Sequence, residues 1–274
     1  MTNHNSSLIV VLPFHGGDLP LAEKLLAWIC ELAAYRDHYL LLATDGGVDR
    51  SRIVAMVESA KPRFDAVWGI NINVPPQRQA WIAGSDFMFL QTAKYIYERT
   101  KCPFLWLEPD CIPLAQGWLK QLAAAYECTP MRFLGTIVRQ TDQPELPREH
   151  MTGCGLYPQD AFLLFNQLQT VVNGTQAFDI AAASQIVPAA KDSPLMQSYW
   201  GMKDLWPVFV EARTEQSPKN HLPLSFLKKE TVLFHRDKEH SLIPLLRKRL
   251  FGSRSRKTAA VVEVTPPEPA AADA

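Results

Sequence analysis

The stretch from Phe104 to Leu119 reads FLWLEPDCIPLAQGWL. Its first four residues are apolar and run directly into Glu108-Pro109-Asp110, a pattern that predicts a buried strand ending in two acidic side chains. Side chains two residues apart on an extended chain point the same way, so both carboxylates can face one cation. Two carboxylates that point together repel each other at neutral pH unless a cation or a basic side chain lies between them. The sequence therefore predicts that a cation or a basic side chain lies between Glu108 and Asp110.

Short apolar runs alternate with longer amphipathic ones on the amino-terminal side of this stretch and just after it. The apolar runs predict strands, and runs with apolar residues at three- and four-residue spacing predict helices. We expect strands at 8–12, 39–44, 64–72, 104–107 and 132–138, and helices at 21–35, 48–61, 79–99 and 116–126. Strands that alternate with helices over short connections form a parallel sheet covered by helices on both faces. The fold class expected is therefore α/β with a mostly parallel sheet.

The residues that follow the predicted strands are polar, glycine-rich or acidic. Pro13-Phe14-His15 follows the first strand and Asp45-Gly46-Gly47 the second, while Glu108 and Asp110 follow the fourth. Ligands in such sheets bind at the carboxyl ends of the strands. Helix capping or turn formation explains the first two segments as well as ligand binding does.

Beyond residue 140 the alternation weakens. We expect a polar loop at 140–150 that could cover a site, a glycine-interrupted strand at 151–158, helices at 161–172 and 180–190, and a strand at 231–234. His235 ends that last strand, and His240 is expected to be solvated.

Composition excludes several classes of protein. The chain has 274 residues, of which 47% are hydrophobic, so a disordered or fibrous protein is excluded. Its 28 basic residues balance 28 acidic ones, which argues against a nucleic-acid partner. Five cysteines without a C-x-x-C pair suggest neither a disulfide framework nor a zinc knuckle. With no long apolar run and no signal-peptide pattern, we expect a soluble, cytoplasmic protein.

The segment 247–274 differs in composition from the rest. Residues 247–257 hold six basic and no acidic side chains, and the remainder is rich in alanine and proline. We expect a disordered, solvated tail, with weak contact to an anionic membrane surface as the alternative.

The segment FLWLEPDCIPLAQGWL resembles the metal-binding segment of GT-A-fold glycosyltransferases, nucleotide-sugar-dependent enzymes whose Asp-x-Asp motif holds Mn²⁺ or Mg²⁺. Glu108 stands where that motif has its first Asp, a variant that lengthens the carboxylate by one methylene. The resemblance implies a GT-A-like, Rossmann-type sheet and the transfer of a sugar from a nucleotide-sugar donor to a hydroxyl of a carbohydrate or other acceptor. It also implies one domain over 1–246, with a nucleotide-sugar-binding half at 7–139 and a smaller, mixed acceptor-side half at 140–246.

The order of elements resembles the family over most of residues 8–243 and implies roles for single residues. A nucleotide- and diphosphate-binding set is implied that comprises Pro13, Phe14, His15, Asp45, Arg78 and Lys238. His235 is implied as a third metal ligand beside Glu108 and Asp110, since a neutral imidazole is a good ligand for a borderline metal. A surface histidine after an edge strand is the alternative for His235.

The acceptor side is implied to include His150, Thr152 and Gly153, with Trp200 as an apolar platform for a sugar ring or as a packing residue. Asp179 precedes an alanine-rich run, where an aspartate often caps a helix. The resemblance implies instead that Asp179 takes the proton of the acceptor hydroxyl in an inverting enzyme. In a retaining enzyme no such base is required, and Asp179 is then structural.

Two other functions fit the sequence. One is a catalytically silent carbohydrate- or nucleotide-binding domain on the same fold, which the substituted acidic motif permits. The other is a nucleotidyltransferase, which also places acids at strand ends around Mg²⁺. Such enzymes usually have a glycine- and arginine-rich loop after the first strand, and residues 13–18 contain neither arginine nor lysine.

Overall fold

The computed structural model describes residues 7–139, 147, 149–198 and 224–252. Seven strands form the main sheet in the order β3-β2-β1-β4-β7-β6-β8. Their bounds in that order are Phe64–Ile72, Tyr35–Asp45, Ile9–Phe14, Phe104–Trp106, Glu149–Tyr157, Phe133–Arg139 and Ala190–Asp192. A small second sheet has the order β5-β10-β9, with bounds Cys111–Pro113, Leu233–His235 and Met196–Ser198.

Strands β3, β2, β1 and β4 run parallel, β7 is antiparallel to both of its neighbours, and β8 is parallel to β6. Helices flank the sheet, so the expected α/β fold with a mostly parallel sheet is confirmed. The larger helices are α1 (Leu19–Leu32), α2 (Arg50–Ala60), α3 (Trp81–Arg99), α4 (Trp118–Glu127) and α10 (Leu242–Phe251). Short helices follow β7 at Ala161–Phe165 (α5), Gln169–Val172 (α6), Phe178–Ala181 (α7) and Ala183–Ile186 (α8).

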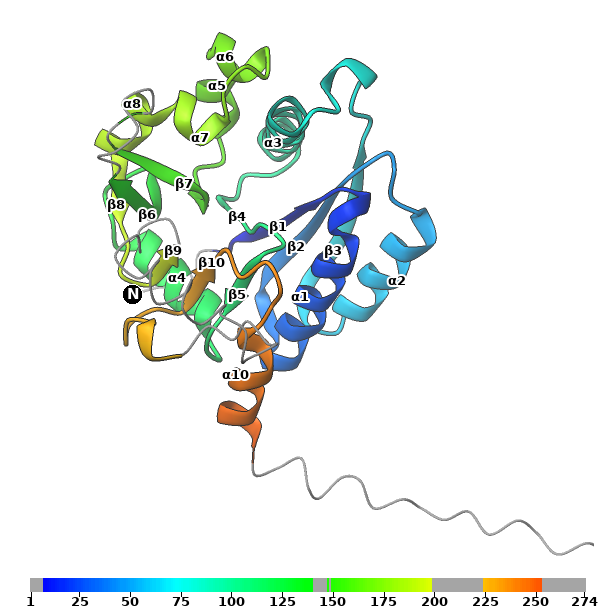
Figure 1. The fold of residues 1–274 in the computed structure, drawn as a ribbon, viewed down its shortest axis with the longest axis vertical. Coiled ribbons are helices and arrows are strands. Elements are labelled where there is room, and N and C mark those ends of the chain that lie inside the picture. Colours follow the sequence, from blue (N-terminus) through cyan, green and yellow to red (C-terminus); the bar gives the residue numbers. More distant parts are fainter. Residues whose placement is uncertain (1–6, 140–146, 148, 199–223, 253–274) are drawn as a thin grey trace, which may run out of the picture.

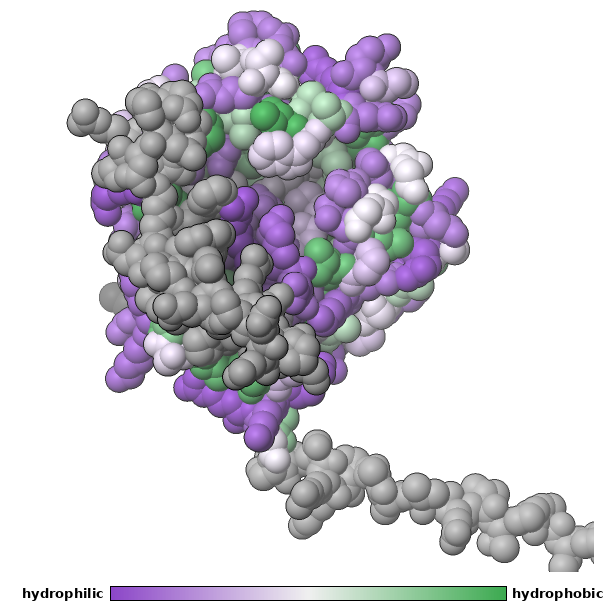
Figure 2. Space-filling model, in the orientation of Figure 1, coloured by the Kyte–Doolittle hydropathy of each residue, from purple (hydrophilic) through white to green (hydrophobic). Residues whose placement is uncertain are grey.

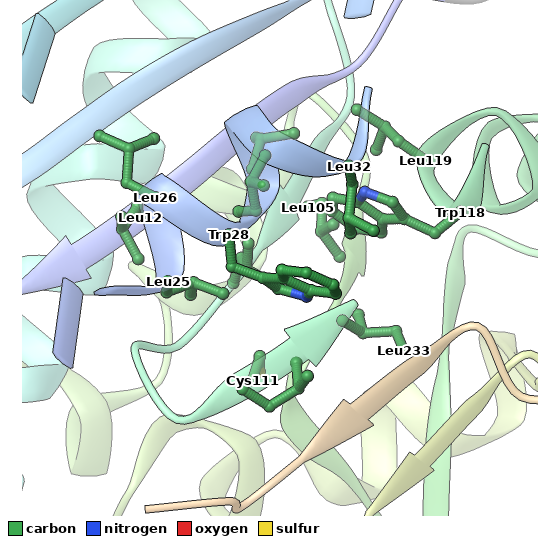
Figure 3. Close-up of a cluster of buried hydrophobic side chains, with 14 of the residues drawn as sticks. Leu12, Leu25, Leu26, Trp28, Leu32, Leu105, Cys111, Trp118, Leu119 and Leu233 are labelled. Atoms are coloured by element: carbon green, nitrogen blue, oxygen red, sulfur yellow. The ribbon is translucent and has the colours of Figure 1, made fainter. Parts of the chain in front are cut away.

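Two hydrophobic cores lie on opposite faces of the sheet. Val10 and Leu12 of β1 pack with α1, α2, α4 and α10, whereas Ile9 and Val11 pack with α3 and the short helices. Because β1 is covered on both faces, all six of its residues are buried, which is why its sequence reads as a continuous apolar run. Figure 3 shows Trp28 of α1 and Trp118 of α4 among the leucines of the first core. The Trp28 Nε1–H donates to the Pro113 carbonyl at 2.8 Å, which ties α1 to β5.

Several element boundaries differ from those predicted. The helix predicted at 21–35 ends at Leu32, because Tyr35 already begins β2, where it pairs with Phe64 of β3. The first strand continues through Pro13 to Phe14. Pro13 is tolerated there because β4 ends at Trp106, which leaves β1 with β2 as its sheet neighbour beyond Val11. The helices predicted at 161–172 and 180–190 are each divided into shorter ones, and β5 is too short to have been predicted.

The boundary predicted at residue 247 lies inside α10, which extends to Phe251. Arg247 does not belong to a solvated tail, because its guanidinium binds Glu31 of α1 at 2.6 Å and lies over the Trp28 ring. Residues 253–274 lie outside the described part of the chain. Among the helices that the structure describes, none combines the length and the apolar character that crossing a bilayer requires.

Candidate active site

A cavity of about 1070 Å³ lies at the carboxyl ends of β1, β2 and β4, the edge where the sequence predicted a site. Figure 2 shows this face hollowed, with hydrophilic side chains inside the hollow. Twelve of the predicted site residues line it: Pro13, Phe14, His15, Asp45, Glu108, Asp110, His150, Thr152, Gly153, Asp179, His235 and Lys238. A cavity of this size can hold a ligand larger than one sugar.

The two acids and His235 meet at one point of this cavity. After β4 the chain turns at Glu108-Pro109-Asp110 and enters β5, which pairs antiparallel with β10 and sets His235 opposite Cys111. The His235 Nε2 atom is 3.0 Å from Glu108 Oε2 and 3.5 Å from Asp110 Oδ1. The pairing of β5 with β10 therefore brings His235 to two acids that precede it by about half the length of the chain.

The loop after β10 is fastened to the acidic turn. The backbone N–H groups of Arg236 and Asp237 both donate to the Asp110 carbonyl, at 3.1 and 2.9 Å. His240 Nε2 lies 2.6 Å from the Pro109 carbonyl and is fully buried, so the expectation that His240 is solvated is wrong. Arg236 and His240 have φ angles of 84° and 54°, an uncommon left-handed conformation that these contacts hold in place.

This loop places two basic side chains at the cavity. Lys238 Nζ is 3.7 Å from Asp110 Oδ2, and Arg236 lines the cavity beside it. Sequence reasoning had singled out Lys238 but missed Arg236. The sequence indicates Arg236 only weakly, because a single arginine after a strand is common. The left-handed turn at Arg236 contains no glycine that would have predicted it.

Charge interactions are strong at this turn. Burial alone would raise the pKa of Glu108, but the adjacent His235 lowers it. Burial and the nearby Glu108 together raise the pKa of Asp110. Burial disfavours the imidazolium, yet Glu108 and Asp110 outweigh burial and raise the pKa of His235 to about 9. The site thus favours positive charge between its two carboxylates.

Gly153 of β7 makes room for the first acid. A Cβ atom at this position would lie 2.6 Å from Glu108 Oε1 and 3.3 Å from Cζ of Phe178. Real Cβ atoms do not approach that closely, so the Glu108 carboxylate occupies the space that the missing side chain leaves.

We expect Gly153→Ala to push the Glu108 carboxylate away from His235. If Glu108 holds a cation, as the resemblance implies, this change weakens Mn²⁺ binding by roughly 10- to 100-fold, because ligand orientation is lost. Calorimetric titration of the folded protein with Mn²⁺ measures this. Gly16→Ala is the control, since a Cβ there would meet its first neighbour only at 3.6 Å. An unchanged affinity in Gly153→Ala would contradict the expected role of Glu108.

Asp179 lies in the first turn of α7 and not at its N-cap, which is Ala177. Its Oδ1 accepts the Ile180 N–H at 3.0 Å, and it lines the cavity. Burial and the proximity of Glu108 raise the pKa of Asp179 to about 6. A carboxylate with this pKa is ionised at neutral pH and still has useful proton affinity, as a general base requires.

A second carboxyl group holds α7 in place. Asp86 of α3 is fully buried, and its Oδ1 accepts the Phe178 N–H at 3.0 Å. Its Oδ2 has no hydrogen-bond partner among the described residues. Burial, together with the charge of Asp179, raises the pKa of Asp86 to about 7.

Because the folded protein binds a proton at Asp86 more tightly than the unfolded chain does, ionisation of Asp86 opposes folding. The stabilisation that the protonated Asp86 contributes is fully present below about pH 4 and is lost as the pH rises through about 7. Asp86→Asn keeps the Oδ1 acceptor and cannot ionise. We therefore expect its stability relative to the wild type to increase between pH 4 and pH 8, by up to about 4 kcal/mol. Urea denaturation at both pH values tests this, and a constant difference would contradict it.

Other predicted residues have different surroundings. His15 Nδ1 accepts the Gly17 N–H at 2.9 Å and Asp45 Oδ1 accepts the Gly47 N–H at 3.2 Å, so both also shape their own turns. His150 is buried, and burial lowers its pKa. Arg78 is not among the residues that line the cavity, and its guanidinium lies over the Phe87 ring at 5.4 Å. Trp200 lies outside the described residues.

Comparison with known proteins shows that the fold of this chain is similar to that of GT-A-type glycosyltransferases. No family model matches the chain, and no curated protein matches its sequence. The similarity to solved structures is therefore one of fold, at sequence identities near 11%.

Three of these structures show its extent. An active-site mutant of LgtC matches with a TM-score of 0.57 and 11% identity, over 90% of this chain and 96% of LgtC. The bifunctional glycosyltransferase WbbM matches with a TM-score of 0.54 and 12% identity, over 86% of this chain and 47% of WbbM. The glycosyltransferase GlyE of Streptococcus pneumoniae TIGR4 matches with a TM-score of 0.52 and 11% identity, over 90% of this chain and 64% of GlyE. This chain thus spans about half the length of WbbM.

Proposed function

We propose that this protein is a metal-dependent glycosyltransferase that moves a sugar from a nucleotide-sugar to an acceptor hydroxyl. One observation carries the proposal: Glu108, Asp110 and His235 converge at the strand ends, inside a cavity large enough for a nucleotide-sugar. The fold supports it, because the solved structures that match this chain include several glycosyltransferases.

The residues at the turn fit a divalent cation. Asp110 Oδ1 is buried and has no hydrogen-bond partner among the described residues, although His235 lies 3.5 Å away. Two carboxylates and an imidazole are a donor set that Mn²⁺ accepts, and Mg²⁺ accepts the carboxylates. Glu108, Asp110 and His235 would hold the ion. When bound, it supplies positive charge that offsets the negative charge on the diphosphate.

The basic side chains beside the turn complete the donor site. Arg236 and Lys238 line the same wall and bind the diphosphate oxygens, a role in which Arg236 replaces Arg78. Pro13, Phe14, His15 and Asp45 line the cavity at the ends of β1 and β2 and contact the nucleoside. As negative charge grows on the departing nucleoside diphosphate, the positive side chains of Arg236 and Lys238 stabilise it.

The acceptor binds on the β7 and α7 side of the cavity. Gly153 and Thr152 form its floor together with His150, and Asp179 faces the acceptor hydroxyl from α7. The Asp179 carboxylate takes the hydroxyl proton as the new glycosidic bond forms at the anomeric carbon and the bond to the diphosphate breaks. This step inverts the anomeric configuration.

The test is a panel of nucleotide-sugars incubated with the full chain in the presence of Mn²⁺, with release of nucleoside diphosphate as the signal. We expect turnover with at least one donor, its loss with a chelator, and an inverted anomeric proton in the product by NMR. Tight binding of a nucleoside diphosphate with Mn²⁺ but no turnover on any donor would instead favour a silent binding domain. A retained configuration would remove Asp179 from the role of base.

A further inference from the structure

Two buried thiols lie beside the acidic turn and have no part in the proposed transfer. Cys111 begins β5 directly after Asp110, and Cys154 follows Gly153 on β7. Both side chains are almost completely shielded from solvent, and their sulfur atoms are 3.3 Å apart without a disulfide bond. Buried thiols often serve as small apolar packing groups, so the pair alone indicates no function.

One thiol, however, lies within ligand distance of the acidic turn. Asp110, Cys111 and His235 each offer a ligand atom, and these atoms all lie within 4.8 Å of one another. All three residues are buried, whereas the Glu108 side chain is 32% exposed. The Oδ1 atom of Asp110, a residue that is 8% exposed, has no hydrogen-bond partner within the described residues and lies 3.5 Å from His235 Nε2, so it is open to either cation position.

We propose that Asp110, Cys111 and His235, with Cys154 as a fourth ligand, form a second cation position that takes thiophilic metals such as Zn²⁺, Cd²⁺ and Co²⁺. It lies on the core side of the position beside Glu108. Occupation of this second position blocks transfer, because it draws Asp110 and His235 away from the cavity. This last consequence rests on the proposed function, whereas the binding itself does not.

The geometry needs only small movements. Tetrahedral zinc has Zn–S distances of about 2.3 Å and Zn–N distances of about 2.0 Å, so neighbouring ligand atoms lie roughly 3.6 Å apart. The ligand atoms of Asp110, Cys111 and His235 have to approach one another by roughly 1.2 Å at most. The Cys154 sulfur, 3.3 Å from that of Cys111, has to separate from it by a few tenths of an ångström. Each thiol that becomes a ligand releases its proton to solvent, so no oxidant or reductant is needed.

The ligand atoms also determine which metal each of the two positions prefers. Thiolate ligands select zinc and similar soft cations, while Mg²⁺ and Mn²⁺ prefer carboxylate oxygen. The position beside Glu108 therefore suits Mg²⁺ or Mn²⁺, and the position beside Cys111 suits Zn²⁺.

The test is an optical titration of the full chain with Co²⁺ after removal of metals by a chelator. We expect a sulfur-to-cobalt charge-transfer band in the near ultraviolet that Zn²⁺ abolishes by displacement. The band should be lost in Cys111→Ser and weakened in Cys154→Ser. Cys30→Ser and Cys128→Ser, which change thiols outside the cluster, should keep it. The Zn²⁺ concentration that halves Mn²⁺-supported transfer should rise at least about tenfold in Cys111→Ser.

A wild-type Co²⁺ spectrum without the band overturns the proposal, as does an unchanged band in Cys111→Ser. An unchanged band in Cys154→Ser overturns the fourth ligand. Because Cys111 lies in the core, its variant needs a folding check by circular dichroism. If it unfolds, X-ray absorption of the zinc-loaded wild type decides, since a sulfur shell at about 2.3 Å supports the site and a shell of only nitrogen and oxygen overturns it. A cobalt band without sugar transfer would support the second cation position and contradict the proposed transferase function. Mn²⁺-dependent transfer without a band would support the transferase function and contradict the second cation position.

Discussion

Asp110→Asn is expected to lower metal-dependent turnover by roughly a thousandfold. Loss of the charged ligand weakens metal binding, and the transition state then loses about 4 kcal/mol of stabilisation. Asparagine has nearly the same shape as aspartate, so packing at this buried position is preserved. The backbone carbonyl of residue 110 still accepts the Arg236 and Asp237 N–H groups, and the loop after β10 keeps its place. Initial rates at increasing Mn²⁺ concentration measure the loss and show whether excess metal restores turnover.

The matched control is Asp160→Asn. Asp160 is also a carboxylate paired with a basic group, Arg132 at 2.6 Å, but it is exposed and does not line the cavity. We expect it to leave turnover unchanged. Wild-type turnover in Asp110→Asn, or an equal loss in both variants, would mean that the acidic turn does not hold the metal.

The sequence was informative where chemistry follows local pattern. The apolar run before Glu108 predicted a strand end, and the period of two along a strand predicted that Glu108 and Asp110 act together. The order of strands and helices predicted a parallel sheet, so the ends of β1, β2 and β4 could be placed at one edge before any contact was known. His235 was placed near them by resemblance in the order of elements.

The rest depends on contacts that no local pattern encodes. His240 was expected in solvent, yet it is buried because the loop after β10 folds back on the Pro109 carbonyl. Arg236 lines the cavity for the same reason. Arg247 looked like the start of a charged tail, but its partner Glu31 lies on α1, more than 200 residues earlier. Such pairings are decided by tertiary packing and not by composition.

Asp86 illustrates the same limit at the acceptor side. Its position on α3 has the character of a core residue, and an aspartate there would normally face solvent. The carboxyl group is retained because it satisfies the Phe178 N–H at the start of α7. Sequence alone cannot show that a helix more than 90 residues later needs that acceptor.

Asp179→Asn is expected to reduce turnover by roughly 10²- to 10⁴-fold, because the acceptor hydroxyl loses its proton acceptor. In the wild type, activity should rise with pH through about 6, since burial and the proximity of Glu108 raise the pKa of Asp179 to that value and only the ionised carboxylate accepts a proton. The variant has no carboxylate to ionise, so its residual rate should lack this rise. Rates at saturating Mn²⁺ between pH 5 and pH 8 measure both effects.

Asp179 has other titratable groups around it, which are Glu108, His235, Asp86, Arg236 and Tyr157. Saturating metal keeps the Glu108, Asp110 and His235 ligands in one protonation state, and Asp86→Asn removes a carboxyl group whose pKa is about 7. Asp49→Asn is the matched control, because Asp49 does not line the cavity, accepts the Ser51 N–H at the start of α2, and asparagine caps helices equally well. If Asp179→Asn keeps the same rise through pH 6, another group titrates there and Asp179 serves only to position α7.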